Sequence, residues 1–339
     1  MSGELTLKAR YRLRLTRKRL LWRAFRKRRE LQSVTVRATE ISDAPILLFA
    51  TIRNEMQRLP YFLAHYRRLG VGHFLIVSND STDQSDAYLD QQPDVSLWRT
   101  QHGYKSARFG MDWLTWLQRK YADDKWIVTV DADELLIYPD WDTRGLGPLT
   151  AWLDQNALRA LPAMMLDLYP KGSPDDFEYT SDQDPLTVLN WFDATGYWSE
   201  KRGRHRTTTT LGGVRSRCFF GDDPDKSPTL SKVPLIKWRQ SYAYLSSTHV
   251  ALPPDLNRCF DPMGADAPSG VLLHTKFLPG IGARAQEDQR RGQQYTKWAA
   301  HDAYYDALAL SPDLWQPGST RYTGWRQLVD LGLMRRGTW

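Results

Sequence analysis

The sequence is poor in cysteine and contains no long apolar run. Cys218 and Cys259 are its only cysteines, and no Cys-x-x-Cys pair occurs, so neither a zinc site nor a disulfide framework is indicated. The longest apolar stretches, such as 45–50 and 126–130, are far shorter than the roughly 20 residues that span a bilayer. Charges are spread through the first residues, which therefore do not predict a signal peptide. A reducing, cytoplasmic setting fits these features.

The chain also lacks the two common glycine-rich phosphate loops. Neither G-x-G-x-x-G nor G-x-x-x-x-G-K-[ST] occurs, which argues against dinucleotide and P-loop enzymes. The 339 residues are 41% hydrophobic and predict a globular chain, either one large α/β domain with appendages or two small domains.

Positive charge is concentrated at the N-terminus. Residues 1–30 contain 12 of the 46 Lys and Arg and 2 of the 39 Asp and Glu, a balance of +10, so the rest of the chain has 34 bases and 37 acids, a balance of −3. Apolar residues such as Trp22 and Phe25 alternate with these bases, which suits an interfacial helix on anionic lipid. A solvated basic arm is the alternative. Nucleic acid is not expected as a partner, because the body is slightly acidic and no nucleic-acid-binding motif occurs.

From residue 43 onward, apolar runs alternate with segments of helical periodicity. The pattern predicts right-handed crossovers and an α/β fold with a mainly parallel sheet flanked by helices. The predicted strands are 46–51, 73–77, 95–98, 126–130, 163–168 and 270–278, and the predicted helices are 54–69, 106–121 and 149–158.

Three acids, Asp131, Asp133 and Glu134, follow the predicted strand 126–130. In open α/β sheets the ligand crevice lies beyond the carboxyl ends of the strands. Unpaired buried negative charge is costly, so a hard cation or basic side chains must neutralise these acids. One interpretation is a divalent metal that carries a phosphorylated ligand. The other is a loop of solvated acids that caps a following helix.

The polar segments after three of the strands carry a family resemblance. They are Thr51-Ile52-Arg53-Asn54-Glu55, Asn79-Asp80-Ser81-Thr82-Asp83-Gln84-Ser85 and Asp131-Ala132-Asp133. In this order, residues 44–280 resemble the family 2-like glycosyltransferases of the GT-A fold, which is Rossmann-like. Among them, the chain looks closest to the bacterial group with R-N-E and D-x-S-T-D loops, which is often linked to surface polysaccharide synthesis.

The resemblance implies a metal-dependent, inverting transfer of a sugar from a UDP- or GDP-linked donor to a saccharide or lipid-linked acceptor. Asp131 and Asp133 would hold Mn²⁺ or Mg²⁺, which neutralises charge on the diphosphate leaving group, and Asp131 could face the ribose instead. Turn and cap chemistry is the alternative for 79–83. The residues that match nucleotide-contacting positions are Thr51, Arg53, Glu55 and Asp80.

Basic residues elsewhere could contact the same donor. His274 and Lys276 lie two residues apart in an apolar strand, so their side chains face the same side. The resemblance implies that His274 completes the metal shell and that Lys276 holds the diphosphate. A hydrogen-bonded core histidine is the alternative, and His249 competes for the metal role. Lys105 and Arg108, at the start of the helix before the acidic segment, could meet phosphate or be ordinary residues of a helix N-terminus.

Asp193 and Asp167 are candidates for the catalytic base, which takes a proton from the acceptor hydroxyl. The family usually supplies this carboxylate after the strand that follows D-x-D, but this chain lacks the E-D pair found there. Asp193 is favoured because Trp191 and Phe192 would stack on an acceptor sugar beside it. The alternative is that Asp193 is a rim residue on a loop. Until the base is identified, the sequence does not decide between inversion and retention.

Two other classes of function stay open. A D-x-D after an apolar strand also occurs in haloacid-dehalogenase phosphohydrolases, although those enzymes carry it on the first strand. A non-catalytic carbohydrate-binding scaffold is the third class, because a fold does not establish a function. The predicted organisation is a basic, membrane-associated tail over 1–42, a GT-A domain over 43–280 and a helical extension over 281–339, in a cytoplasmic protein peripheral to the inner face of the membrane.

Overall fold

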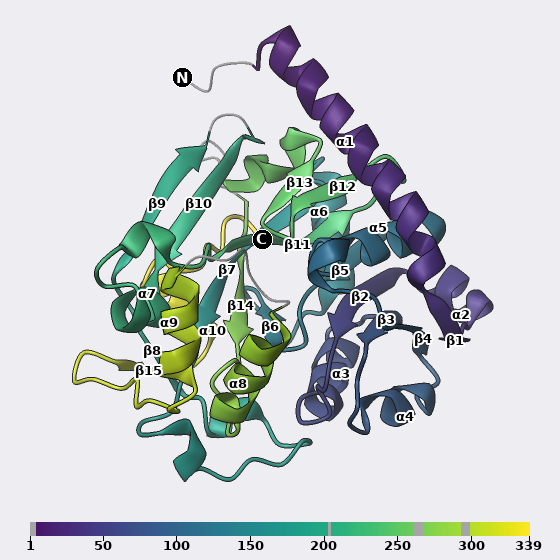
Figure 1. Ribbon diagram of the computed structural model, residues 1–339. Helices are drawn as coiled ribbons and strands as arrows, with labels where there is room; N and C mark the ends of the chain where they lie inside the picture. Colours follow the sequence, from purple (N-terminus) through teal and green to yellow (C-terminus); the bar gives the residue numbers. More distant parts are fainter. Residues whose placement is uncertain (1–4, 203–204, 261–266, 293–298) are drawn as a thin grey trace.

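The computed structural model describes residues 5–202, 205–260, 267–292 and 299–339. Over these residues a central sheet of nine strands has the order β1-β4-β3-β2-β5-β11-β7-β14-β6, and helices cover both of its faces (Figure 1). Strands β2, β3, β4, β5, β7 and β14 point in one direction, whereas β1, β11 and β6 run against them. The predicted Rossmann-like α/β class, with a mainly parallel sheet flanked by helices, is therefore confirmed.

The sheet strands and the helices are distributed along the whole described chain. The sheet is formed by β1 (Gln32–Thr35), β2 (Ile46–Ile52), β3 (His73–Asn79), β4 (Val95–Thr100), β5 (Trp126–Thr129), β6 (Glu134–Ile137), β7 (Ala160–Asp167), β11 (Ser231–Lys237) and β14 (Gly270–His274). The helices are α1 (Leu7–Lys27), α2 (Ala38–Asp43), α3 (Leu59–Arg68), α4 (Ser85–Asp90), α5 (Met111–Tyr121), α6 (Leu146–Gln155), α7 (Gly213–Phe219), α8 (Ile281–Arg291), α9 (Ala299–Leu308) and α10 (Trp325–Asp330). Three two-stranded sheets pair β8 (Trp191–Phe192) with β15 (Thr320–Arg321), β9 (Tyr197–Arg202) with β10 (Thr207–Gly212), and β12 (Ala243–Ser246) with β13 (Val250–Leu252).

Both faces of the central sheet are buried. Along β2, Ile46 and Leu48 pack into one hydrophobic cluster, while Leu47 and Phe49, which alternate with them, pack into another. Each fully buried side chain of this size contributes about 1.5–3 kcal/mol relative to an exposed one. The apolar runs without a polar face therefore belong to interior strands, as predicted for residues 126–130.

Two helices begin later than the sequence periodicity predicts. Helix α3 begins at Leu59 and not at residue 54, because Pro60 occupies its first turn, where a missing N–H leaves no hydrogen bond unmade. The predicted helix 106–121 is interrupted by a left-handed stretch that ends at Gly110 (φ 77°), and α5 follows it. A Cβ on Gly110 would lie 2.5 Å from Thr51 Oγ1, so glycine allows this loop to approach β2 closely.

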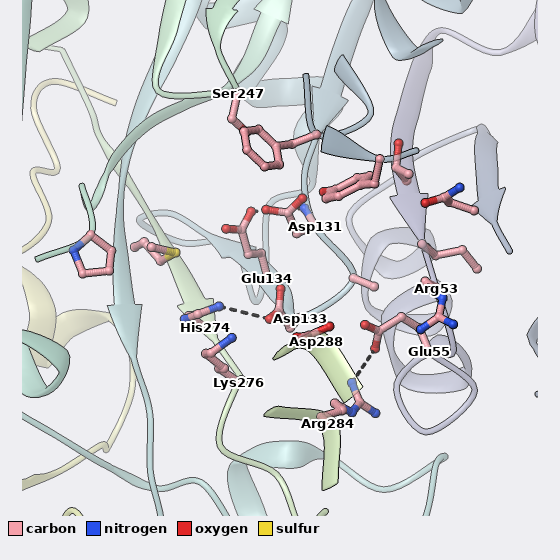
Figure 2. A pocket seen from close by; sticks show the side chains of 18 of the residues that line it. Arg53, Glu55, Asp131, Asp133, Glu134, Ser247, His274, Lys276, Arg284 and Asp288 are labelled. Carbon is pink, nitrogen blue, oxygen red and sulfur yellow. Dashed lines mark hydrogen bonds and ion pairs between the residues drawn. The ribbon is translucent and has the colours of Figure 1, made fainter. Parts of the chain in front are cut away.

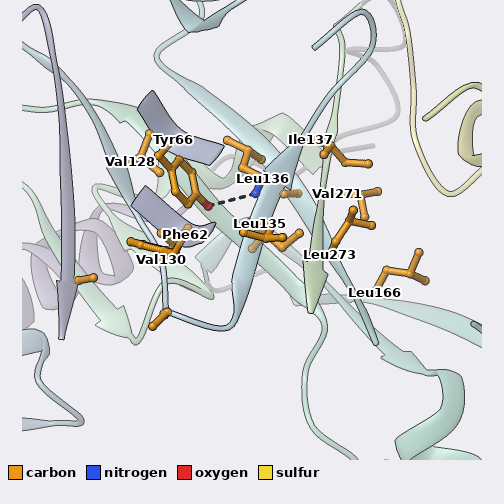
Figure 3. Packing of buried hydrophobic residues seen from close by; sticks show 14 of the residues in the cluster. Phe62, Tyr66, Val128, Val130, Leu135, Leu136, Ile137, Leu166, Val271 and Leu273 are labelled. Atoms are coloured by element: carbon orange, nitrogen blue, oxygen red, sulfur yellow. Dashed lines mark hydrogen bonds between the residues drawn. The ribbon is translucent and has the colours of Figure 1, made fainter. Parts of the chain in front are cut away.

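The acidic segment joins two strands of the sheet and does not cap a helix. Glu134 is the first residue of β6, so the interpretation of these acids as helix-capping residues is wrong. Tyr66 of α3 holds the start of β6 in place. Its hydroxyl donates to the Glu134 carbonyl oxygen at 2.8 Å. It also accepts from the Leu136 N–H at 3.0 Å (Figure 3). In the antiparallel pair β6–β14, Glu134 lies opposite His274. The acids after β5 therefore lie beside the end of β14.

The C-terminal residues pack on the same sheet. Ala285 of α8, Tyr304 of α9 and Trp325 of α10 belong to the hydrophobic cluster that also contains Leu48 and Leu272. This packing places α8 beside the strand ends, where its polar side chains can reach the acidic segment.

The basic N-terminal segment forms a helix that contacts the body. Leu13 and Leu20 of α1 are buried in a small cluster with Ala243 and Leu252. The segment is thus helical, as the prediction of an interfacial helix requires. No helix in the described part of the chain combines the length and apolar character needed to cross a membrane.

His65 makes the stability of the protein sensitive to acid. Burial lowers its pKa to about 4, and its Nε2–H donates to the Leu136 carbonyl oxygen at 2.9 Å. As the pH falls from about 6.5 to 4, this histidine becomes protonated in the unfolded chain but not in the folded chain. The free energy of unfolding therefore falls by up to about 3 kcal/mol. We expect His65→Gln to remove this loss. Urea unfolding at pH 7 and pH 4.5 measures the free energy of unfolding, and the wild type should exceed the variant by less at pH 4.5 than at pH 7. The exposed His102 provides the control His102→Gln, and an equal pH dependence in both variants would contradict the assignment.

Candidate functional site

A cleft of about 850 Å³ opens at the carboxyl ends of β2, β5 and β14 (Figure 2). It brings together eight of the eleven residues that the sequence predicts for the site, and the predicted phosphate contact Lys105 and the alternative ligand His249 also line it. The eight are Thr51, Arg53, Glu55, Arg108, Asp131, Asp133, His274 and Lys276.

The first two predicted loops hold each other in place. The Asn54 N–H donates to Ser81 Oγ at 3.2 Å, and Asn54 Oδ1 accepts from the Thr82 N–H at 2.7 Å. The Glu55 N–H donates to Ser85 Oγ at 3.0 Å. The R-N-E and D-x-S-T-D segments therefore form one hydrogen-bonded unit, which fixes the direction of Arg53 and Glu55 at the cleft.

Asp131 shares a basic partner with Glu134. Lys232 of β11 is almost fully buried and places its Nζ 3.0 Å from Asp131 Oδ2, and it also donates to Glu134. Although burial opposes the charge on Lys232, the two carboxylates outweigh it and raise the pKa of this ammonium group. The Asp131 side chain is 50% exposed and faces the cleft, whereas that of Glu134 is 1% exposed. Lys232 therefore neutralises part of the acidic segment without a metal.

Asp133 lies in a chain of alternating charges. His274 Nε2 is 3.1 Å from Asp133 Oδ2 (Figure 2). The other ring nitrogen of His274 bonds Asp167. Asp167 also accepts a hydrogen bond from Arg215 Nε at 2.8 Å. Burial alone would raise the pKa of Asp167, but Arg215 and His274 outweigh it and lower this pKa to about 2. The same balance between burial and His274 lowers the pKa of Asp133, so both carboxylates are charged at neutral pH.

Helix α8 places further charged residues across the cleft. Arg284 Nη1 lies 3.0 Å from Glu55 Oε2 (Figure 2), which also accepts from Arg58 Nη1 at 2.9 Å. Burial is the largest influence on Glu55 and raises its pKa to about 7. From the same helix, Glu287 pairs with Arg53 at 3.1 Å. The residues that line the cleft include nine Lys or Arg and six Asp or Glu, a balance that favours an anionic ligand.

Four residues that line the cleft have a buried donor atom with no hydrogen-bond partner among the described residues. Three of these atoms, Thr51 Oγ1, Arg53 Nε and Arg108 Nη2, belong to predicted nucleotide-binding residues, and the fourth is Arg58 Nε. Buried donors are normally satisfied. Their position at one cleft is the arrangement expected of a site that contacts a polar ligand.

Asp80 is not among the residues that line the cleft, but it lies beside Arg53, which is. Its side chain is 47% exposed, and its Oδ2 is 4.0 Å from Arg53 Nη2. The turn chemistry weighed for this segment is present, because Asp83 Oδ1 accepts a hydrogen bond from the Ser85 N–H at 2.9 Å, where α4 begins. The contact predicted between Asp80 and a nucleotide base stays a prediction.

The structure does not place Asp193 at the cleft. Its carboxylate bonds Arg217 at 2.8 Å and the Tyr169 hydroxyl, and it lines a separate pocket of about 220 Å³. The flanking Phe192 is fully buried and does not offer a face to an acceptor sugar. The reason is the pairing of β8 with β15, which takes Trp191 and Phe192 out of the central sheet. The expectation that Asp193 is the base that reaches the acceptor hydroxyl is corrected accordingly.

Asp167, the second candidate base, lies behind the cleft wall. Both of its oxygens are occupied, one by His274 and one by Arg215, and its lowered pKa makes it a poor proton acceptor. Its position instead fits a residue that orients His274, because a ligating histidine usually donates its other ring N–H to a carboxylate.

The donor set fits a divalent cation in part. No group of three His, Cys, Asp or Glu that could hold a metal occurs among the described residues. Two ligands at about 2.1 Å from one octahedral ion lie roughly 3 Å apart, which matches the 3.1 Å between Asp133 Oδ2 and His274 Nε2. One carboxylate with phosphate oxygens from the substrate is a usual arrangement for Mg²⁺, whereas an imidazole ligand such as His274 is more typical of transition metals. Asp131, the other predicted metal ligand, is held by Lys232.

Sequence reasoning missed Lys232, Arg215 and Arg284. A signal existed for Lys232, which lies within the apolar run S-K-V-P-L-I-K, where a buried lysine requires acidic partners. Arg215 and Arg284 give no such signal, because their partners Asp167 and Glu55 are 48 and 229 residues away.

The fold and the cleft define an α/β protein with a predominantly basic ligand site at the carboxyl ends of its strands. Comparisons of the sequence with protein-family models and with curated proteins give no match. Among solved structures, the chain is similar to the mannosyltransferase PcManGT from Pyrobaculum calidifontis, in complex with GDP-Man and Mn²⁺, at a TM-score of 0.27 and 17% identity. The match covers 48% of each chain, so this chain spans about half the length of that enzyme. It is also similar to a 4-diphosphocytidyl-2C-methyl-D-erythritol synthase, at a TM-score of 0.26, 11% identity and coverage of 85% of this chain and 98% of the other. Likenesses this distant do not decide function.

Proposed function

We propose that this protein is a metal-dependent glycosyltransferase that uses a nucleotide-sugar donor. The observation that supports it most is the Asp133–His274 pair, 3.1 Å apart, in a cleft with an excess of bases. A diphosphate needs both features, because its negative charge must be neutralised by a cation and by basic side chains.

In this proposal, different residues of the cleft bind different parts of the donor. Asp133 and His274 hold Mn²⁺ or Mg²⁺, which when bound neutralises charge on the diphosphate leaving group. Lys276 and Arg108, which line the same cleft, contact the diphosphate oxygens. The half-exposed carboxylate of Asp131 accepts a hydrogen bond from the ribose. Thr51 and Arg53, which also line the cleft, contact the nucleotide.

We assign the catalytic base to Asp288 of α8 and the stereochemistry to inversion. Asp288 lines the cleft on the α8 side (Figure 2), where Lys276 and Glu55 act on its charge, and burial raises its pKa. A carboxylate with a raised pKa is a better acceptor for the proton of an attacking hydroxyl. The resemblance to surface-polysaccharide enzymes supports a saccharide or lipid-linked acceptor.

Donor hydrolysis tests the proposal. The full chain is incubated with a panel of UDP- and GDP-sugars, with Mn²⁺ or with EDTA, and release of nucleoside diphosphate is measured. We expect at least one donor to be hydrolysed in Mn²⁺ and its turnover to be lost in EDTA. Hydrolysis of a simple phosphate monoester, with no nucleotide sugar consumed, would identify a phosphohydrolase. If the chain bound no nucleotide sugar with or without metal, it would be a non-catalytic scaffold.

The same assay tests Asp288 once an acceptor is supplied. Asp288→Asn should lower sugar transfer by about 100-fold or more while donor binding is retained. Glu287→Gln removes the same charge from the neighbouring residue, which pairs with Arg53, and should have a smaller effect. Equal losses in the two variants would move the base elsewhere.

A further inference from the structure

Helix α1 has two apolar faces. One packs on the body through Leu13, Leu20 and Ala24, which are buried. The other, here called the α1 outer face, points to solvent, and its members lie within about 80° of one another at 3.6 residues per turn. They are four large side chains with exposed fractions of 82, 62, 37 and 60%, Leu7, Tyr11, Leu15 and Trp22.

Exposed bases border this stripe on both sides. At the helical spacing of 100° per residue, six of them fall on its two flanks, and Lys18 alone projects from within the stripe. One flank has Lys8, Arg12, Arg19 and Arg26, and the other has Arg10 and Arg14. None of the six forms an ion pair with an acid among the described residues. The apolar and basic residues that alternate in the sequence therefore form two separate apolar faces of the helix, with bases between them.

The helix is fixed to the part of the body that lines the cleft. Arg23 Nη2 lies 2.9 Å from Asp112 Oδ2 and donates to the Ser106 carbonyl oxygen at 3.0 Å. Asp112 is fully buried and also bonds Arg108 Nε at 2.8 Å. Because Arg108 lines the cleft, the α1 outer face has a set position relative to it. Figure 1 shows α1 along one edge of the molecule, outside α5.

We propose that the α1 outer face docks on an anionic phospholipid bilayer. A helix with an apolar centre and basic flanks lies in the plane of the interface, where the apolar side chains enter the acyl boundary and the bases meet lipid phosphates. Nucleic acid would use the bases but not the aliphatic Leu7 and Leu15, because its recognition is led by phosphate contacts. The surface therefore holds the cleft at a fixed height above the bilayer.

Vesicle sedimentation tests this docking with the full chain. Vesicles of phosphatidylcholine with and without phosphatidylglycerol are used at about 0.05 M and 0.5 M salt. We expect binding to the anionic vesicles alone, and weaker binding at the higher salt, where the Debye length is shorter. Trp22→Ala and the double variant Lys18→Glu, Arg26→Glu should each weaken vesicle binding, the double variant by more than about tenfold.

Matched controls separate this surface from general effects. Leu310 is an 81% exposed apolar residue far along the chain, so Leu310→Ala controls for Trp22→Ala. The exposed pair Lys201 and Arg326 allows the same change in net charge outside α1, and both controls should bind vesicles as the wild type does. Equal loss in variants and controls would overturn the proposal, as would equal binding to neutral vesicles or a preference for RNA that Trp22→Ala leaves unchanged. Donor hydrolysis, measured separately without vesicles, does not depend on this outcome.

Discussion

Replacement of Asp133 by Asn should abolish Mn²⁺-dependent donor turnover, with a loss of about 100-fold or more. Asn keeps the size of the side chain but removes the negative charge that a cation requires beside His274 Nε2, 3.1 Å away. The main-chain carbonyl oxygen of Asp133 still accepts from the Thr275 N–H at 2.7 Å, so the connection between β5 and β6 should persist. The measurement is nucleoside diphosphate release at saturating donor over a range of Mn²⁺ concentrations.

The control for this variant is Asp330→Asn. Asp330 is exposed at the end of α10 and lies outside the residues that line the cleft. It should keep wild-type turnover and the wild-type dependence on Mn²⁺. If Asp133→Asn also kept both, Asp133 would not be a metal ligand in the reaction.

Replacement of Lys232 by Met should destabilise the protein by about 3–5 kcal/mol, because it leaves a carboxylate buried without its partner. Lys232 and Glu134 have side-chain exposures of 4 and 1%, so water cannot replace the lost ammonium group. Urea unfolding followed by circular dichroism measures the change. The doubly substituted Lys232→Met, Glu134→Gln should recover much of the loss, since neither charge then remains.

Lys237→Met is the matched control on the same strand. Lys237 pairs with Asp154 at 2.9 Å, but both side chains are partly exposed, and such pairs contribute about 0–1 kcal/mol. A similar loss in both lysine variants, or no recovery in the double variant, would contradict the account of Lys232 as a buried counter-ion.

The sequence predicted the parts of the fold that depend on local pattern. The apolar runs at 46–51 and 73–77 lie within β2 and β3, because a strand covered on both faces needs an uninterrupted apolar segment. The same pattern failed where tertiary contacts override it. Strand 270–278 was predicted to continue past His274, but β14 ends there, and the Thr275 N–H then bonds the Asp133 carbonyl oxygen.

The candidate site was predictable where its residues follow strand ends. Arg53, Glu55, Asp131 and Asp133 come directly after β2 and β5, and parallel strands bring such positions to one edge of a sheet. Lys232 of β11 pairs with Asp131, and Arg284 of α8 pairs with Glu55, each from far away in the sequence, so the sequence does not show which acid each base meets. For the same reason, the β8–β15 pairing that removes Asp193 from the cleft could not be foreseen.

The most direct test of the metal site is pulsed electron paramagnetic resonance of Mn²⁺ bound to the full chain with UDP or GDP. Two samples are compared, one with natural histidine and one with ¹⁵N-labelled histidine. The account predicts a coupling between the manganese and a histidine nitrogen that changes on labelling and persists in His249→Gln, the other histidine of the cleft. A bound Mn²⁺ with no histidine coupling, or a coupling lost in His249→Gln, would contradict the assignment of His274 and Asp133.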